Sequence, residues 1–155
     1  MIQNVKKILV PIDFSEHSTE AMRGAMDLAK EVGAEVHLMN VIAPHQTFIP
    51  LLLLARNAEQ SRELARESAM MEQAEQELAR IKKDDFGGSK KVFTFVVVGP
   101  PAQKLVEYAK EHAIDLIVMS THGLTGVEYM IGSVTEKVVR NAPCSVLVFR
   151  PRNRP

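Results

Sequence analysis

The sequence is poor in residues that would point to a disulfide, a metal centre or a membrane span. Its 155 residues include one cysteine, Cys144, and no tryptophan. A single cysteine excludes a disulfide within the chain and fits a reducing compartment. No cluster of histidine and cysteine has the spacing of a zinc site. The most apolar stretch, FIPLLLLA at 48–55, is far shorter than the roughly 20 residues that cross a membrane.

The chain also lacks an excess of charge of either sign. Lysine plus arginine and aspartate plus glutamate number 19 each, so the net charge is zero. A neutral chain offers no general attraction to nucleic acid or to an anionic membrane. The local exception is the basic tail, residues 151–155, which we expect to be solvated. We therefore expect a soluble, cytoplasmic protein with neither nucleic acid nor membrane as a partner.

Hydrophobic periodicity predicts strands that alternate with helices. Apolar runs predict strands at residues 7–12, 35–43, 91–99, 115–120 and 144–149. Three- and four-residue spacing predicts helices at residues 15–33, 51–83, 100–114 and 133–143, the first capped by Ser15 or Ser18 and stopped by Gly33. This order predicts one α/β domain, residues 1–150, with a parallel sheet covered by helices on both faces.

The long predicted helix has one apolar face, which we interpret as core or interface packing. The residues that share this face are Leu64, Ser68, Met71, Ala74, Leu78 and Ile81.

A glycine-rich segment, THGLTGVEYMIGSVTEK at 121–137, follows the fourth predicted strand. Ligands of open α/β sheets bind outside the carboxyl ends of the strands, and a helix amino terminus favours phosphate. The strand ends at Ser120 and the last helix follows Gly132, so Ser133 and Thr135 could help to cradle a polyphosphate. The alternative is a plain turn, in which Ser133 caps the helix and Glu136 completes a capping box. The segment matches neither a Walker loop nor the dinucleotide fingerprint.

Four other side chains have less specific interpretations. Asp13 ends the first strand beside the same crevice, where its carboxylate could accept hydrogen bonds from a ribose or an adenine amine; the alternative is a loop aspartate bonded to nearby backbone. We interpret His122 as structural, with a phosphate contact as the alternative, and His37 as a surface or packing residue. Cys144 is interpreted as a small buried residue and not a nucleophile.

Taken together, the stretches KILVPIDFSEHSTEAMRGAMDLAKEVGAEVHLMNVI and DLIVMSTHGLTGVEYMIGSVTEKVVRNAPCSVLVFRP resemble the universal stress protein family, over about residues 5–150. The resemblance implies a Rossmann-like fold with five parallel strands in the order 3-2-1-4-5. It implies a homodimer joined largely through the last strands, here Ser145 to Phe149. It also implies a subclass that binds ATP.

That subclass has the pattern Gly-x2-Gly-x9-Gly-Ser/Thr, which Gly123, Gly132 and Ser133 match in part. Two departures stand out: Ser120 replaces the first glycine, and eight residues instead of nine separate Gly123 from Gly132. The resemblance also assigns Asp13 to the family's acidic position, and it brings the end of the second strand to the adenine. The nucleotide-binding residues expected from the motif and the resemblance are Pro11, Asp13, Val41, Ser120, His122, Gly123, Gly132, Ser133, Val134 and Thr135.

The leading hypothesis is a regulatory protein of the stress response that binds ATP or AMP, with Mg²⁺ held in part by Asp13, and that acts on a protein partner the sequence does not identify. One alternative is a slow ATPase. We assign no catalytic residue, because phosphoryl transfer needs a metal and charge stabilisation, and the glycine segment up to Gly132 has no lysine or arginine. The other alternative is a dimeric interaction module that binds no nucleotide.

Overall fold

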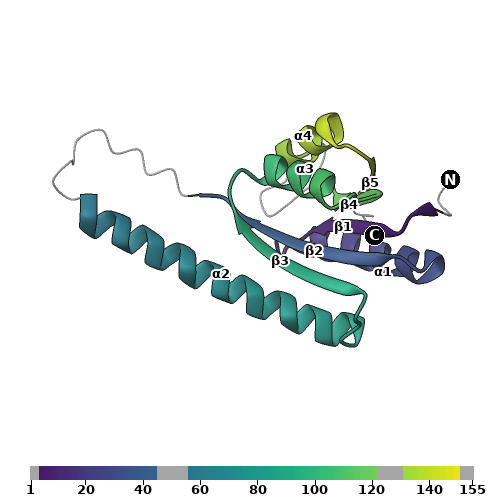
Figure 1. The fold of residues 1–155 in the computed structure, drawn as a ribbon, viewed down its shortest axis with the longest axis horizontal. Coiled ribbons are helices and arrows are strands. Elements are labelled where there is room, and N and C mark those ends of the chain that lie inside the picture. Colours follow the sequence, from purple (N-terminus) through teal and green to yellow (C-terminus); the bar gives the residue numbers. More distant parts are fainter. Residues whose placement is uncertain (1–3, 45–55, 122–130, 151–155) are drawn as a thin grey trace, which may run out of the picture.

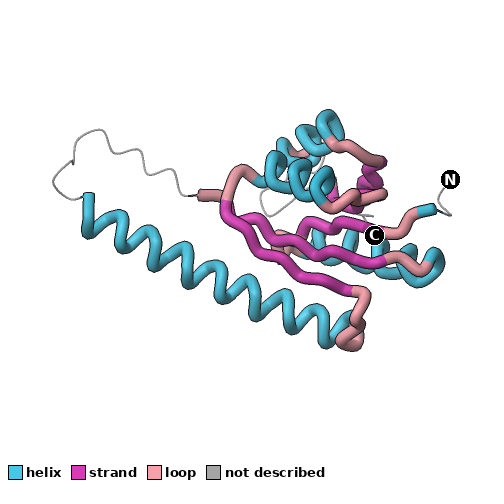
Figure 2. The backbone as a smooth tube through the Cα atoms, in the orientation of Figure 1, coloured by secondary structure: helices cyan, strands magenta, loops and turns pink. Residues whose placement is uncertain are grey.

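A computed structural model of the chain describes residues 4–44, 56–121 and 131–150, with the side chains of the long helix described from Arg62 onward. The described residues form a five-stranded parallel sheet in the order β3-β2-β1-β4-β5, with helices on both faces (Figures 1 and 2). The predicted fold class and strand order are confirmed. The strands are β1 (Lys7–Pro11), β2 (Glu35–Ile42), β3 (Val92–Val98), β4 (Leu116–Ser120) and β5 (Ser145–Phe149). The helices are α1 (Glu16–Val32), α2 (Arg56–Phe86), α3 (Pro101–Glu111) and α4 (Ser133–Asn141).

The central strand β1 supplies side chains to both cores, because alternate residues of a strand point to opposite faces. Ile8 and Val10 are fully buried and pack with residues of α1 and α2. Leu9 is fully buried on the other face, among residues of α3 and α4. The sheet is therefore sandwiched between two helical layers, which Figure 1 shows above and below it.

The ends of α1 follow from its local sequence. Ser15 is the N-cap, and its Oγ accepts a hydrogen bond from the backbone N–H of Ser18 at 3.1 Å. Gly33 ends the helix in the left-handed conformation, φ 73°, which glycine adopts without a steric cost. Of the two serines that could have capped the helix, Ser15 is the one that does so.

The long helix α2 confirms only half of its predicted apolar face. Ala74, Leu78 and Ile81 are buried against the sheet, but Leu64 is 65% exposed and Ser68 is also exposed. The amino-terminal half of α2 extends beyond the sheet (Figure 1), so none of the described elements covers it. The helix also continues to Phe86, three residues beyond the predicted end.

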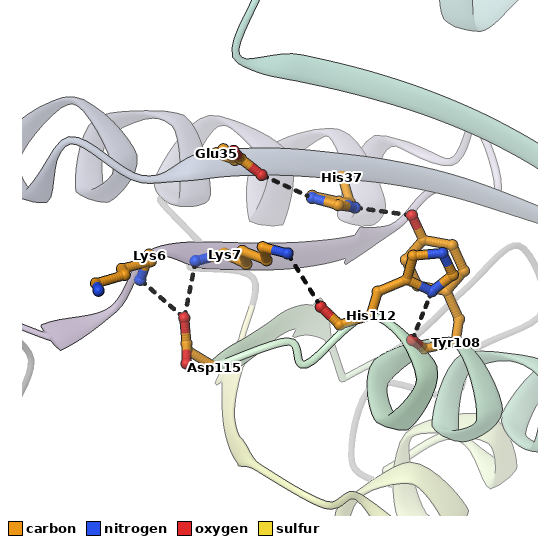
Figure 3. Close-up of polar contacts among 7 residues, drawn as sticks. All are labelled: Lys6, Lys7, Glu35, His37, Tyr108, His112 and Asp115. Atoms are coloured by element: carbon orange, nitrogen blue, oxygen red, sulfur yellow. Dashed lines mark hydrogen bonds and ion pairs between the residues drawn. The ribbon is translucent and has the colours of Figure 1, made fainter.

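A buried histidine joins β2 to α3 (Figure 3). The His37 side chain is 6% exposed. Its Nδ1 lies 2.7 Å from the Tyr108 hydroxyl and its Nε2 lies 3.4 Å from Oε2 of Glu35. Because a carboxylate only accepts hydrogen bonds, Nε2 donates to Glu35 and Nδ1 accepts from Tyr108. The His112 ring stacks on the Tyr108 ring, with centroids 3.9 Å apart.

Burial lowers the pKa of His37 below its usual value, and the positive charge of Lys7 and nearby His112 act in the same direction. The hydrogen bond and charge of Glu35 offset this effect only in part. Phe93 and Phe95, from β3, add apolar rings against the imidazole. Burial also raises the pKa of Tyr108 to about 12, so its hydroxyl remains a donor at all physiological pH values. The interface between β2 and α3 therefore favours a neutral His37.

We predict that His37 makes the fold sensitive to acid. Below about pH 6.5 the histidine of the unfolded chain is protonated while the folded one stays neutral, so unfolding takes up a proton. The free energy of unfolding should fall as the pH drops from about 6.5 to the lowered pKa, by at most about 1.4 kcal/mol per pH unit. Urea unfolding between pH 7.5 and 5 measures this change in the free energy of unfolding.

The variant His37→Gln should lose this part of the acid dependence. Tyr108→Phe should narrow the pH range over which the stability falls. The neutral His37 then loses its hydrogen-bond donor, so its pKa in the folded state is lowered less. Equal pH dependence in the wild type and His37→Gln would contradict the prediction.

Candidate functional site

The strand order places a topological switch point at the carboxyl ends of β1 and β4, which is where doubly wound sheets open a ligand crevice. These strands are neighbours, with Ile8 opposite Leu116 and Leu9 opposite Ile117. After β1 the chain continues into α1, whose residues belong to one core, whereas α4, after β4, belongs to the other. The two connections therefore leave the sheet towards opposite faces, which is the arrangement that opens a ligand crevice in doubly wound sheets.

Short polar contacts hold the chain after β1 in a tight turn. The N–H of Ile12 donates to Met39 O at 2.9 Å, and the buried Asn40 side chain donates to Ile12 O at 2.7 Å. The Asp13 carboxylate then accepts from the N–H of Ser15 at 2.9 Å. This is the loop-aspartate contact given above as the alternative for Asp13. It fixes the orientation of the carboxylate at the edge of the crevice, so the contact and a ligand role are compatible.

Between Asp13 and Ser15, Phe14 has a left-handed backbone, with φ 63°. A residue other than glycine has a cost of about 1–2 kcal/mol in this region, and bulky residues adopt it rarely. The Phe14 side chain is 38% exposed. Phe14 is not among the site residues expected from the sequence, although it lies next to Asp13.

The amino terminus of α4 has no side-chain cap. The N-cap residue is Gly132, and the helix begins at Ser133. The N–H of Glu136 bonds to the carbonyl oxygen of Gly132, at 3.0 Å. The alternative interpretation, a capping box with Ser133 as the cap, is therefore wrong, because Ser133 is already the first residue of the helix. The first turn keeps backbone N–H groups and the positive end of the helix dipole for another acceptor.

Two hydrogen bonds tie the start of α4 to the end of β4. Thr135 is buried and its Oγ1 donates to the carbonyl oxygen of Ser120 at 2.9 Å. The N–H of Gly132 donates to the carbonyl oxygen of Thr121 at 2.7 Å. A Cβ on Gly132 would lie 3.2 Å from that same oxygen, so glycine permits the close approach. The N–H of Thr121 in turn donates to Phe149 O at 2.9 Å, which links this corner to β5.

This arrangement of strands and helices is shared with a known protein family. Residues 4–150 match the model of the universal stress protein family. The chain belongs to the universal stress protein family. Its resemblance to that family in sequence is thereby confirmed.

Relatives of known sequence cover nearly the whole chain. Universal stress protein MJ0531 of Methanocaldococcus jannaschii is 40% identical over 146 residues, which are 94% of this chain and 82% of that one. Universal stress protein MJ0577 of the same organism is 33% identical over 156 residues, 96% of each chain.

Solved structures of universal stress proteins share the fold. The structure of MJ0577 has a TM-score of 0.80 at 30% identity and covers 97% of this chain and 99% of its own. UspA of Lactobacillus plantarum has a TM-score of 0.66 at 29% identity, covering 94% and 98%. A universal stress protein in complex with cAMP has a TM-score of 0.60 at 24% identity, covering 94% and 97%, and shows the fold alone.

The described part of this universal stress protein brings eight of the ten expected nucleotide-binding residues to one edge of the sheet. They lie at the ends of β1, β2 and β4 and at the start of α4; the other two, His122 and Gly123, lie outside the described residues. Ser120 ends β4 and is not among the described residues with positive φ, so the first departure from the glycine pattern has no backbone cost here. The eight are Pro11, Asp13, Val41, Ser120, Gly132, Ser133, Val134 and Thr135.

The described residues offer little for other kinds of site. Within residues 4–44, 56–121 and 131–150, no group of three or more His, Cys, Asp or Glu side chains could hold a metal ion, and no helix could span a membrane. Cys144 is half-buried, and burial raises the pKa of its thiol, with the charge of Asp115 acting in the same direction. A thiol that resists ionisation is a poor nucleophile.

We predict that Thr135→Val will destabilise the fold. The substitution keeps the shape of the side chain but removes the donor to Ser120 O, which leaves a buried carbonyl without this bond. The expected loss is about 1–2 kcal/mol, or a fall in Tm of roughly 2–6 °C, measured by thermal denaturation. Thr94→Val is the matched control, because Thr94 is half-buried on β3 and forms no hydrogen bond through its side chain. Equal Tm values for the two variants would contradict the prediction.

Proposed function

We propose that the protein is a cytoplasmic adenine-nucleotide-binding regulator of the stress response, with ATP or AMP at the carboxyl edge of the sheet. The observation that carries the proposal is the amino terminus of α4, which lacks a side-chain cap and is tied to the end of β4. Such a terminus offers N–H donors and a partial positive charge to phosphate. A universal stress protein of the same fold has been solved with cAMP, so this fold can hold an adenine nucleotide.

In this proposal the phosphates lie at the start of α4, near Gly132 and the N–H groups of Ser133, Val134 and Thr135. Ser133 is exposed and can offer its hydroxyl as well, whereas the hydroxyl proton of Thr135 is already donated to Ser120 O. Ser120, His122 and Gly123 complete this end of the site.

The adenosine would lie at the ends of β1 and β2. Asp13 would accept from the ribose or the adenine amine, and the backbone of Val41 would contact the base beside Pro11. Where Mg²⁺ accompanies ATP, the Asp13 carboxylate would help to hold it. Occupancy would then shift the protein between states that differ in affinity for the nucleotide, and so alter its surface for a partner protein.

The first experiment identifies small molecules released on denaturing the protein as purified, by liquid chromatography and mass spectrometry, followed by calorimetric titration with ATP and AMP. The proposal expects a near-stoichiometric adenine nucleotide, or saturable binding of one. No released nucleotide and no binding at millimolar ATP with Mg²⁺ would refute it and favour the interaction module. Turnover of ATP well above background, lost in Asp13→Ala, would instead show an ATPase.

We predict that Gly132→Val will weaken ATP binding at least ten-fold. The branched side chain would occupy the space at the start of α4 that a phosphate needs, while φ at Gly132 is −60°, which any residue can adopt. Gly132→Ala is the control, because its Cβ makes the same 3.2 Å approach to Thr121 O without the two methyl groups. Both variants need a thermal melt, since Thr121 must shift slightly. A folded Gly132→Val protein that binds ATP normally would exclude this phosphate site.

The proposed assembly is a homodimer through β5. This strand is at the edge of the sheet, where backbone hydrogen-bonding groups are available to a second strand, and Leu147 is 42% exposed on it. An isologous contact between two such edges gives a closed dimer.

We predict that Leu147→Glu will lower the molar mass measured by light scattering from a dimer to a monomer. A single substitution suffices, because each copy brings its own Glu to the two-fold contact and the two carboxylates repel each other. The control is Leu64→Glu, an exposed leucine far from β5 in the sequence, in the part of α2 that extends beyond the sheet. Dimers that persist in Leu147→Glu would exclude this interface.

A further inference from the structure

Phe14 has a backbone conformation that its side chain disfavours. Among the described residues other than glycine, positive φ occurs at Phe14 and Ala113. Ala113 directly follows the C-cap of α3, where a left-handed residue is the ordinary way to end a helix. Phe14 precedes a helix, so helix termination does not account for it. Phe14 lies between Asp13 and Ser15, which are joined by the hydrogen bond from the N–H of Ser15 to the Asp13 carboxylate, and Ser15 in turn accepts from the N–H of Ser18. These bonds set the turn and with it the dihedral angles of Phe14.

Core packing does not account for the phenylalanine either. Its side chain is 38% exposed, and it belongs to neither of the two hydrophobic clusters nor to the partly buried residues packed against them. Glycine would satisfy the backbone at this position without strain. The chain instead has a large aromatic ring that remains partly in solvent.

The position of Phe14 supplies a reason for the ring. It follows Asp13 at the carboxyl end of β1, in the turn that borders the crevice between β1 and β4. Aromatic rings stack on nucleobases of any kind, and strained residues concentrate at ligand sites. We propose that the ring of Phe14 is part of the nucleotide site and contacts the base. This inference rests on the function proposed above and adds a residue to it.

The test compares three substitutions by calorimetric titration with ATP, AMP and inorganic tripolyphosphate. Phe14→Ala keeps the strained backbone and removes the ring, Phe14→Gly removes both, and Phe14→Tyr keeps both. Ala and Gly should weaken ATP and AMP binding by the same factor, about five-fold or more, whereas Tyr should retain the wild-type affinity. Binding of tripolyphosphate, which has no base, should be the same in all three.

Thermal melts separate the ring from the backbone. Phe14→Gly should melt a few degrees above Phe14→Ala, because glycine alone is free of the left-handed strain. Ala113→Gly is the matched control: it relieves the same kind of strain at the opposite edge of the sheet and should leave ATP affinity unchanged.

Wild-type affinity for ATP in both Phe14→Ala and Phe14→Gly would overturn the inference and leave the proposed function intact. An equal loss for tripolyphosphate would also overturn it, because the ring would then be acting on the turn and not on the base. Unchanged AMP binding in Phe14→Ala and Phe14→Gly would overturn the inference as well. No nucleotide binding by the wild-type protein would overturn both the inference and the proposed function.

Discussion

The candidate site depends on one corner of the fold, where the Thr135 hydroxyl donates to Ser120 O and the N–H of Gly132 donates to Thr121 O. Because these bonds join the last residues of β4 directly to the first turn of α4, they fix both ends of the glycine-rich segment independently of its length. The segment is one residue shorter than the family pattern, but the shortening falls between two anchored ends. The donors proposed for phosphate belong to the anchored helix, so the departure does not by itself displace them.

Gly132 has two separate physical reasons to be glycine, and the sequence cannot distinguish them. A Cβ there would crowd Thr121 O at 3.2 Å, which concerns only the chain itself. A side chain there would also stand in front of the first turn of α4, which concerns a ligand. The absence of a side-chain cap is more informative than the glycine, because a plain turn would satisfy the helix terminus with Ser133, whereas here Ser133 is already inside the helix.

Much of the fold could be predicted because its signals are local or periodic. Apolar runs bounded by charge gave the strands, and Ser15 and Gly33 gave the ends of α1. Periodicity shows which residues share a face but not whether anything covers that face, so Leu64 was grouped with the buried Leu78 although it is exposed. The contact of His37 with Tyr108 joins residues 71 positions apart and has no local signal. The left-handed Phe14 arises from hydrogen bonds made by its neighbours, and so its own identity did not reveal it.

The two edges of the sheet differ in a way that favours the carboxyl edge for an anionic ligand. At the amino edge, Asp115 accepts from the N–H groups of Lys6 and Lys7, each at 2.9 Å, so exposed backbone is already paired (Figure 3). A cavity of about 460 Å³ also opens there, between the carboxyl-terminal ends of α1 and α2. Two lysines line it, Lys30 and Lys91, and the Lys91 ammonium donates to Gly33 O. The carboxyl-terminal ends of α1 and α2 also face it, and their negative dipole ends repel phosphate. At the carboxyl edge the helix dipole has the opposite sign, because α4 presents its positive end there without a side-chain cap. The helix dipoles therefore favour the carboxyl edge over this cavity for an anionic ligand.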